Sequence, residues 1–400
     1  MKSSVKICIV GLGYIGLPSA ALLANRGYPV QGVDICPEVV DTINQGDIHI
    51  VEPDLDSFVH SAVNSGNLKA SLEPEPADIF ILAVPTPFHD GFVPNIEYVL
   101  DAAGAIAPVV KPGDLVILES TSPVGTTEKV AETLRDGGVD TNSIHIAHCP
   151  ERVLPGHIMR ELVENDRIIG GITPEASEKV AAFYRTFVTG EVLVTDARTA
   201  EMAKLTENSF RDVNIAFANE LSLLSDKFGV DVWELIRLAN RHPRVNILQP
   251  GTGVGGHCIA VDPWFIVHEG GEDARLIRTG REVNTRKTEW VVEKIKSQVA
   301  GFHERQGRDP VVACMGLAFK PNIDDLRESP ALWVFHQLVV SGIEPLAVEP
   351  NLKKHASVTL TSWNDAATEA DIVVYLVAHR EFKKLEVKGE VLDFCGVTQA

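Results

Sequence analysis

The sequence predicts an α/β protein with two Rossmann-like, doubly wound domains joined by a long central helix and a helical middle domain. Short β-branched runs alternate with helical patterns in the first and last parts of the chain, and a glycine-rich turn follows the first run. Between these parts, residues 199–228 have a helical composition without proline or glycine. We therefore expect three domains, at residues 1–198, 199–299 and 300–400.

The composition is that of a folded, acidic protein. The 400 residues are 45% hydrophobic and 23% charged, and the formal net charge is −19 at pH 7. Such a chain repels nucleic acid and anionic membranes, so neither is an expected partner. The six cysteines have no paired spacing, which argues against a metal site and favours a reducing compartment. No signal peptide or membrane-length apolar stretch is visible, so we expect a cytoplasmic protein.

The first element is a candidate dinucleotide site. The apolar run VKICIV precedes Gly11, Gly13 and Gly16, and a second strand pattern ends at Asp34. Glycine at these positions permits a tight turn, close approach of a pyrophosphate and packing of helix on strand. The Asp34 carboxylate can accept hydrogen bonds from an adenosine ribose and would repel the extra phosphate of NADP. We therefore expect NAD as the cofactor.

Several strand-like runs of the first domain end in polar or proline-rich turns. The runs lie at residues 5–10, 30–33, 79–84, 115–118 and 144–147. In a parallel sheet, ligands bind beyond the carboxyl ends of the strands. Thr121 and Glu151 lie in such turns, and we interpret both as functional. For Thr86, a ligand contact and a plain turn residue remain equally good interpretations.

The expected central helix carries a polar stripe. Lys204, Asn208 and Arg211 recur at i, i+4 and i+7, so they share one face. Solvated stripes usually mix lysine with glutamate, whereas this one has no acid. A buried lysine can move a proton, and a neighbouring amide can stabilise an oxyanion. We interpret the stripe as functional, with a solvated helix face as the alternative.

Two further features follow in the middle domain. A second helical pattern at 231–240 leads into a basic turn with His242 and Arg244, which in so acidic a protein suits a phosphate. Residues 251–265 then set Cys258 among glycines, which let a backbone approach a ligand closely. The alternatives are a solvated turn and a small core cysteine. We interpret Cys258 as a nucleophile because the upstream cofactor site supplies a chemistry that needs one.

The last part of the chain repeats the α/β alternation. We expect a helix at 272–297, then a polar linker at 300–309, and a further helix that ends near residue 340. The expected strands lie at residues 311–315, 346–348, 372–376 and 391–394.

Six motifs together resemble the UDP-glucose/GDP-mannose dehydrogenase family over essentially the whole chain. They are GLGYIGLP (11–18), ESTSPVGTTEK (119–129), CPERVLPG (149–156), EMAKLTENSFRDVNIAFANEL (201–221), GVGGHCIAVDPWF (253–265) and GLAFKPNIDDLRESPA (316–331). The resemblance implies NAD-dependent oxidation of carbon six of a nucleotide sugar from alcohol to carboxylate. It also implies a homodimer built around the central helix.

Within the family, the motifs are most similar to those of enzymes that act on UDP-N-acetyl-D-mannosamine, and UDP-N-acetylglucosamine is the alternative sugar. Pro155 and His257 stand where UDP-glucose enzymes carry a second acid and often a serine, which argues against UDP-glucose. A single-oxidation β-hydroxyacid dehydrogenase is a further alternative, but it needs no cysteine. A nucleotide-sugar sensor without turnover would have no need for the complete set of catalytic residue types.

The resemblance implies a role for each of three groups of residues. The expected catalytic residues are Cys258, Lys204, Asn208, Asp262, Glu151 and Thr121. The expected cofactor contacts are Gly11, Gly13, Tyr14, Ile15, Gly16, Asp34, Thr86, Thr127 and Arg327. The expected contacts with the UDP-sugar are Arg152, Val153, Lys204, Asn208, Arg211, His242, Arg244, Gly255, Phe319 and Lys320. No metal is expected.

The chemistry explains why a cysteine is needed. An aldehyde has no good hydride to give, but addition of the Cys258 thiolate makes a thiohemiacetal whose carbon-bound hydrogen can leave, and the resulting thioester is then hydrolysed. Lys204 is expected to take the alcohol proton and, with Asn208, to balance the alkoxide. By the resemblance, Thr121 and Glu151 handle the hydrolytic water, and Asp262 helps to deprotonate the water or a neighbouring group; which of the two carboxylates activates the water is left open.

Overall fold

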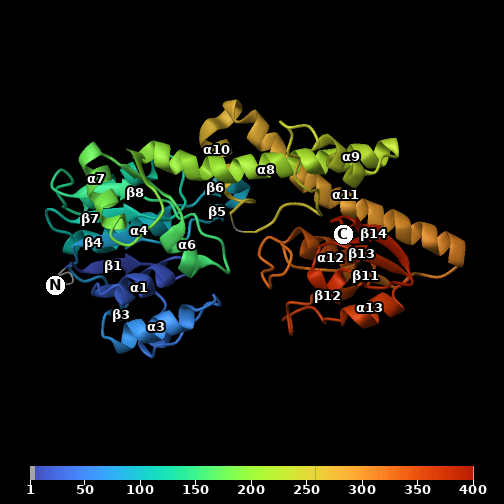
Figure 1. Cartoon of the computed structure of the whole chain (residues 1–400), viewed down its shortest axis with the longest axis horizontal. Coiled ribbons are helices and arrows are strands. Elements are labelled where there is room, and N and C mark those ends of the chain that lie inside the picture. Colours follow the sequence, from blue (N-terminus) through green and yellow to red (C-terminus); the bar gives the residue numbers. More distant parts are fainter. Residues whose placement is uncertain (1–4, 257, 400) are drawn as a thin grey trace. The chain divides into compact units, whose positions relative to one another are not determined.

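The structure is a computed structural model that describes residues 5–256 and 258–399. It confirms the α/β class. The chain forms two compact units, Met1–Thr206 and Glu207–Ala400, and each is built around its own, mainly parallel sheet (Figure 1). Helix α8 (Ala197–Phe228) begins in the first unit and continues into the second.

The sheet of the first unit has the strand order β10-β9-β8-β7-β4-β1-β2-β3. Its strands are β1 (Ile7–Val10), β2 (Val30–Val33), β3 (Leu68–Ser71), β4 (Ile79–Leu82), β7 (Leu115–Leu118), β8 (His145–His148), β9 (Arg167–Gly171) and β10 (Val192–Asp196). The strands from β3 to β8 are parallel, whereas β9 runs antiparallel to β8. The order of the strands reverses between β1 and β4, which is where a doubly wound sheet opens a crevice for a ligand.

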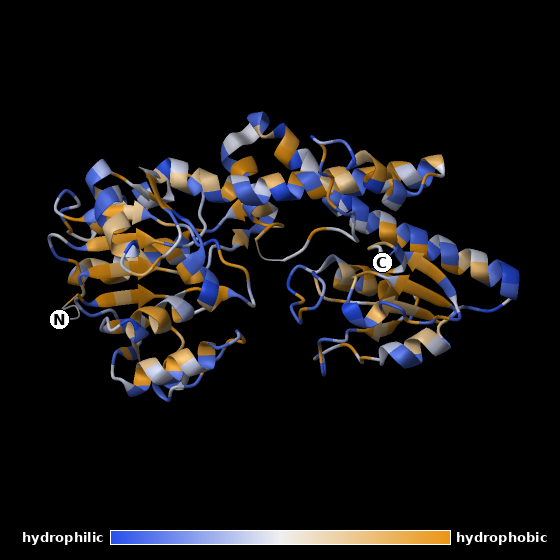
Figure 2. Ribbon diagram, viewed as in Figure 1, coloured by the Kyte–Doolittle hydropathy of each residue, from blue (hydrophilic) through white to orange (hydrophobic). Residues whose placement is uncertain are grey.

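Helices cover both faces of this sheet. They are α1 (Gly16–Asn25), α2 (Pro37–Asn44), α3 (Leu55–Asn64), α4 (Glu97–Ile106), α5 (Thr126–Asp136), α6 (Ile158–Glu164) and α7 (Pro174–Tyr184), and a small hairpin joins β5 (Phe88–His89) to β6 (Val93–Pro94). Alternate residues of β1 enter two separate cores, Ile7 and Ile9 on one face and Cys8 and Val10 on the other. The central strands are therefore apolar on both faces, and their hydrophobic residues give them the orange colour in Figure 2.

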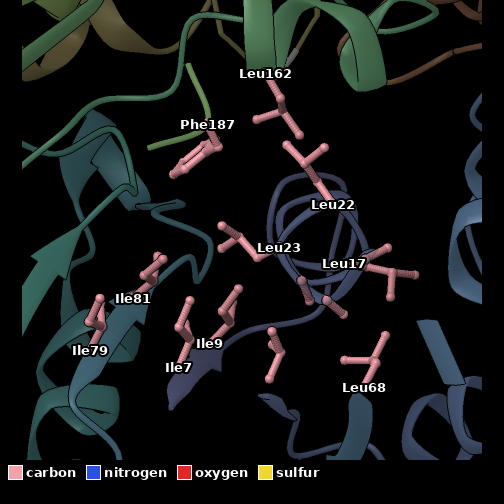
Figure 3. Packing of buried hydrophobic residues seen from close by; sticks show 14 of the residues in the cluster. Ile7, Ile9, Leu17, Leu22, Leu23, Leu68, Ile79, Ile81, Leu162 and Phe187 are labelled. Carbon is pink, nitrogen blue, oxygen red and sulfur yellow. The ribbon is translucent and has the colours of Figure 1, made fainter. Parts of the chain in front are cut away.

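The larger of these cores lies between the sheet and α1. Figure 3 shows Leu22 and Leu23 of α1 among Ile7, Ile9 and Phe187, with other apolar side chains around them. Burial of this kind contributes about 1.5–3 kcal/mol for each large aliphatic side chain. It fixes α1 against β1, and the turn between them is the candidate dinucleotide loop.

The second unit combines helices with a parallel sheet of order β12-β11-β13-β14. Its strands are β11 (Val312–Met315), β12 (Leu346–Val348), β13 (Ile372–Tyr375) and β14 (Glu390–Asp393). Its helices, besides the rest of α8, are α9 (Val232–Ala239), α10 (Asp262–Gly270), α11 (Arg275–Gln306), α12 (Pro330–Val340) and α13 (Trp363–Glu369). None of the helices in the described ranges is long and apolar enough to cross a membrane.

The expected polar linker at 300–309 is wrong, because α11 continues to Gln306. Phe302 is buried in the core that α11 shares with the second sheet, so the helix gains apolar packing in its last turns. The helix ends at Gly307, which has a φ of 69° and takes the left-handed conformation that closes many helices. The charged residues around Phe302 lie on an exposed face of this helix rather than in a linker.

Candidate functional site

The glycine loop between β1 and α1 has the geometry of a phosphate-binding turn. Gly11 has a φ of 93°, and a Cβ there would lie 2.6 Å from the Ala83 carbonyl oxygen. A Cβ at Gly16 would overlap the Gly11 carbonyl, so helix and strand can approach only through glycine. A Cβ at Gly13, in contrast, would meet nothing within 4 Å, so that backbone is open to a ligand. Tyr14 is exposed and Ile15, the next residue, is half-buried.

Asp34 follows β2 and faces the same loop. One carboxylate oxygen accepts a hydrogen bond from the Leu12 amide at 3.0 Å, and the other accepts one from the Cys36 amide at 3.0 Å. The side chain is only half-buried, and each oxygen has capacity for a further hydrogen bond. The carboxylate is therefore oriented by the backbone and still able to accept from ribose hydroxyls.

The turns after β4 and β7 meet at the carboxyl edge of the sheet. The Thr86 hydroxyl donates to the Thr121 carbonyl at 2.6 Å, and the Ser120 hydroxyl donates to the Val84 carbonyl at 2.7 Å. Thr86 and Thr121 are both half-buried. The structure thus brings together two expected site residues that are far apart in the sequence.

Thr127 is tied to a residue that the sequence analysis did not single out. Its amide and hydroxyl both donate to one carboxylate oxygen of Glu201, at 2.7 and 2.6 Å, and the Gly125 amide donates to the other at 2.6 Å. Thr127 and Glu201 are fully buried. The Glu201 carboxylate therefore occupies the positive N-terminus of α5. The expected contact of Thr127 with the cofactor remains a prediction.

A group of titratable residues surrounds Lys204 in the first unit. Burial raises the pKa of Glu151 to about 7, while the nearby Lys204 and Arg167 cations oppose this shift. Burial lowers the pKa of His148 to about 3, and the Lys204 charge acts in the same direction. Lys204 itself is 8% exposed. The structure therefore gathers Lys204, Glu151 and the neutral His148 near the end of β8, where a proton can be taken up at neutral pH.

The segment after Glu151 folds back on its carboxylate. The Val153 amide donates to a Glu151 carboxylate oxygen, and the Arg152 guanidinium donates to the Asp166 carbonyl at 3.1 Å. Glu151, Arg152 and Val153 are all half-buried. The backbone of this turn thus orients the carboxylate that we expect to be catalytic.

In the second unit, the glycine loop before Cys258 packs tightly against the segment after β11. A Cβ at Gly256, which has a φ of 86°, would lie 2.8 Å from a ring carbon of Phe319. A Cβ at Gly255 would overlap the Glu328 carbonyl. These glycines therefore let the loop lie directly on Phe319. His257, on which part of the argument about the sugar rests, lies outside the described residues.

Cys258 begins the turn that leads into α10, four residues before the helix starts at Asp262. The Cys258 carbonyl accepts hydrogen bonds from the amides of Val261 and Asp262 at 2.9 and 2.8 Å. Asp262 is buried, and one of its carboxylate oxygens accepts a hydrogen bond from the Asn208 side-chain amide. The structure thus brings Asn208 and Asp262 together, and the Cys258 turn is built on the same helix start.

Lys320 and Arg211 are two cations of the second unit whose charges interact. Partial burial lowers the pKa of Lys320, and the nearby Arg211 charge lowers it further. Like charges at short range are unfavourable unless an anion lies between them, so this pair suits a diphosphate. Arg327 instead makes a bidentate contact with Asp325, from Nε to Oδ1 at 3.0 Å and from Nη2 to Oδ2 at 2.6 Å. Its expected contact with the cofactor remains a prediction.

The basic turn after α9 is held by Asn240, which the sequence analysis did not identify. Its side chain accepts from the Ile247 amide at 2.7 Å and donates to the Ile247 carbonyl at 3.0 Å. His242 and Arg244 are exposed on the loop that this contact closes, and the Arg244 amide donates to the His242 ring at 3.3 Å. Both basic side chains are therefore available to an anionic ligand.

The residues that we expect to be catalytic fall into two groups, one in each unit. Lys204, Glu151 and Thr121 belong to the first unit, and Asn208, Cys258 and Asp262 belong to the second. Helix α8 links the groups, since it carries Lys204 and Asn208 one turn apart.

Comparison with known proteins relates three long segments of the chain to a single protein family. Residues 5–188, 198–286 and 313–395 match the NAD binding domain, the central domain and the UDP binding domain of the UDP-glucose/GDP-mannose dehydrogenase family.

Individual relatives cover nearly the whole chain. A UDP-N-acetyl-D-mannosamine dehydrogenase of Campylobacter jejuni is 56% identical, over 99% of this chain and 100% of its own. An NDP-N-acetyl-D-galactosaminuronic acid dehydrogenase of Ralstonia nicotianae is 58% identical, over 95% and 92%. The solved UDP-D-ManNAc dehydrogenase of Pyrococcus horikoshii has a TM-score of 0.89 at 39% identity, over 98% and 96%.

Proposed function

The chain belongs to the UDP-glucose/GDP-mannose dehydrogenase family of NAD-dependent oxidoreductases, and we propose that it oxidises UDP-N-acetyl-D-mannosamine to the corresponding uronate. The observation that carries this proposal is the glycine loop before Cys258, which lies against Phe319 in a domain that matches the family's UDP binding domain. A thiol presented beside a nucleotide-binding segment is what a covalent oxidation of a nucleotide sugar requires.

The glycine loop and Asp34 fit the cofactor. Gly13 leaves room for a pyrophosphate at the start of α1, and the half-buried Asp34 carboxylate can accept from ribose hydroxyls. When bound there, NAD supplies the hydride acceptor for each of the two oxidations. We further propose that Tyr14, Thr86 and Arg327 contact it.

The residues of the chain would move the protons and hold the carbon skeleton. In the first oxidation, Lys204 takes the proton of the sugar's C6 hydroxyl, and its charge with the Asn208 amide balances the developing alkoxide. The Cys258 thiolate then adds to the aldehyde carbon, and the thiohemiacetal becomes a thioester when its hydrogen is lost as hydride. The Asn208 contact with Asp262 supports this assignment, because it fixes the amide beside the start of α10.

Hydrolysis of the thioester needs a base for water. We propose that the Glu151 carboxylate takes this proton, that Thr121 helps to orient the water, and that the Cys258 thiolate leaves. The pKa of Glu151, about 7, supports this role because the group can accept and release a proton near neutral pH.

The nucleotide sugar would be held by basic groups of the second unit. Arg211 and Lys320 form a cationic pair, and His242 and Arg244 lie on an exposed loop, so both sites suit the diphosphate. Phe319 and Gly255 would line the sugar side, and Arg152 and Val153 would contribute from the turn after Glu151.

The choice of sugar rests on the relatives. The Campylobacter protein, a UDP-N-acetyl-D-mannosamine dehydrogenase, matches 99% of the chain, and this supports the mannosamine sugar. The Ralstonia protein at 58% identity is named for N-acetyl-D-galactosaminuronic acid, so the galactosamine sugar is a second candidate. UDP-N-acetylglucosamine remains the alternative that the motifs suggest.

We also propose that the enzyme is a homodimer that pairs through α8. Phe210, Phe217, Leu224 and Phe228 recur along this helix at spacings of seven, seven and four residues, and they are 70, 55, 39 and 69% exposed. A stripe of large apolar side chains on one helix can be buried by the same stripe of a second copy. A cytoplasmic location is proposed because the scattered, unpaired spacing of the cysteines suits a reducing compartment.

The proposed three domains have limits near residues 198 and 299. The family matches at 5–188, 198–286 and 313–395 support this division, although α11 crosses the second limit as one continuous helix.

The decisive experiment counts NADH formed per molecule of limiting nucleotide sugar. We expect two NADH from UDP-N-acetyl-D-mannosamine with the wild type and no sustained turnover with Cys258→Ser. The galactosamine and glucosamine sugars are run in parallel. A yield of one NADH, or a fully active Cys258→Ser variant, would refute the covalent route. Preference for another sugar would replace the substrate and leave the route intact.

A further inference from the structure

The segment after β11 has the same local geometry as the dinucleotide loop after β1. Gly11 and Gly316 have φ values of 93° and 92°. Each donates its amide to the last residue of the neighbouring strand, Gly11 to the Val33 carbonyl and Gly316 to the Val348 carbonyl, both at 2.8 Å. The segment that follows Gly316 carries Phe319 and Lys320, which are expected to bind the UDP-sugar.

An acid follows the second strand of each sheet, Asp34 after β2 and Glu349 after β12, but the two acids have different hydrogen-bond partners. Asp34 is half-buried and accepts one backbone amide at each oxygen. Glu349 is only 4% exposed. One of its oxygens accepts the amides of Leu317 and Ala318 at 2.8 and 2.9 Å, and the other accepts the Asn351 amide at 3.1 Å. Glu349 is therefore committed to the protein, whereas Asp34 can still accept from a ribose.

His379 completes this cluster. Its ring is fully buried, its Nε2 lies 3.1 Å from the same Glu349 oxygen, and its Nδ1 accepts the Asn322 amide at 3.0 Å. The Asn351 side chain also lies 3.0 Å from Nδ1. Because a backbone amide can only donate, Nδ1 carries no proton and Nε2 donates to Glu349. One neutral imidazole thus joins the acid to the far end of the loop.

The contacts fix both ends of the segment, and in its middle the Phe319 amide donates to the Asp325 carbonyl at 3.1 Å. Leu317 and Ala318 are held by Glu349. Asn322 has a φ of 63°, a left-handed conformation that asparagine tolerates, and its side chain accepts the Arg380 amide at 2.9 Å. Between these points lie Phe319 and Lys320, which are both half-buried.

We propose that Glu349 and His379 are positioning residues for the UDP-sugar site, and that they act by holding Phe319 and Lys320 in place. This inference rests on the proposed function, since it takes the second unit as the UDP-binding part. The contacts of Glu349 and His379 keep Lys320 near Arg211, where the two cations can bind a diphosphate. They also keep Phe319 against Gly256 of the cysteine loop. In this proposal, Asp34 of the first domain binds a ribose. Glu349, at the matching position of the last domain, instead holds a binding loop in its conformation.

Two matched substitutions separate the two halves of the imidazole. The amide of His379→Asn reaches the position of Nδ1, so it can still accept from Asn322 but loses Glu349. The longer His379→Gln side chain reaches the position of Nε2, so it keeps Glu349 but loses Asn322. The measurement is the Kd of UDP by calorimetry on the full-length protein, with the KM of NAD measured beside it.

We expect His379→Gln to raise the Kd of UDP about tenfold, and His379→Asn to raise it less, because the asparagine keeps its contact with the loop. The KM of NAD should stay unchanged in both. An unchanged Kd of UDP in both variants would overturn the inference, and so would an equal loss of UDP and NAD binding, which is the signature of general unfolding.

A double-mutant cycle tests whether His379 acts through Lys320. In a Lys320→Met background, His379→Gln should have a much smaller effect on the Kd of UDP, because its target has been removed. Full additivity would contradict the positioning role. The outcome is independent of the sugar: wild type that binds UDP but oxidises none of the three sugars would refute the proposed function and leave this test in force.

Discussion

Replacing Glu151 by glutamine should stabilise the protein above about pH 4.5 and strongly reduce its turnover. The pKa of Glu151 is raised from 4.5 to about 7 because the carboxyl, on a half-buried residue, is largely removed from water. Between about pH 4.5 and pH 7, Glu151 therefore keeps its proton in the folded enzyme but has lost it in the unfolded chain. Each pKa unit corresponds to about 1.4 kcal/mol, so the wild type loses up to about 3 kcal/mol of unfolding free energy as the pH rises from about 4.5 to about 7.

Glutamine does not ionise, so the variant should not show this loss. We expect Glu151→Gln to gain stability relative to the wild type between pH 4.5 and pH 8, by up to about 3 kcal/mol. Activity should change in the opposite sense. Without a base for the hydrolytic water, turnover should fall by about 10²- to 10⁴-fold, and the wild-type rate should rise with pH through a midpoint near 7.

The assay compares urea unfolding at several pH values with NADH formation over the same range. Glu164→Gln is the matched control, because Glu164 is a glutamate of α6 with a 60% exposed side chain, and it pairs with Arg160 at 3.4 Å. The Glu164→Gln control should change neither the pH dependence of the unfolding free energy nor the rate of NADH formation. Two results would refute the reasoning: a wild type and Glu151→Gln variant with parallel pH dependence of stability, or a Glu151→Gln variant that still turns over at the wild-type rate.

Three further changes have defined outcomes. Lys287→Met should stabilise the protein at pH 7, because burial lowers the pKa of Lys287 from 10.5 to about 7. The gain in unfolding free energy over the wild type should shrink toward pH 10, because the lysine of the unfolded chain then also loses its proton. Urea unfolding at several pH values measures this gain. Asp34→Ala should raise the KM of NAD about 10- to 100-fold and reduce the preference of the enzyme for NAD over NADP. Steady-state kinetics with both cofactors would test this. Phe217→Asp should convert the proposed dimer to a monomer in light scattering, whereas an unchanged mass would count against pairing through α8.

The elements that the sequence predicted well are those whose pattern is local. Buried parallel strands have continuous apolar runs, so β1, β4 and β7 could be found from the sequence. β10 was missed because it lies at an edge of the sheet and is mostly exposed or half-buried, which leaves a mixed pattern. The expected linker at 300–309 was wrong for a related reason. Its polar composition is typical of a loop, but the segment is helical to Gln306 and packs through the buried Phe302.

Contacts across long sequence separations could not be predicted. Glu201 reaches Thr127, and His379 reaches Asn322, because the fold brings their elements together. No spacing rule connects such pairs. His148 did carry a signal, since a histidine within an apolar strand must be buried without its usual solvation. The glycine loop and Asp34 were accessible because strand, turn, helix and acid follow one another directly in the sequence.

Glu201 explains how a lysine on a long helix comes to lie beside one strand end. The Glu201 carboxylate is fixed by the amides of Gly125 and Thr127 at the start of α5, and α5 follows the turn after β7. Lys204 lies three residues after Glu201, on the same face of α8. Anchoring the acid therefore sets both the register and the rotation of the helix against the sheet. The positive N-terminus of α5, which in other proteins would bind a phosphate, here holds the helix that presents Lys204 beside Glu151.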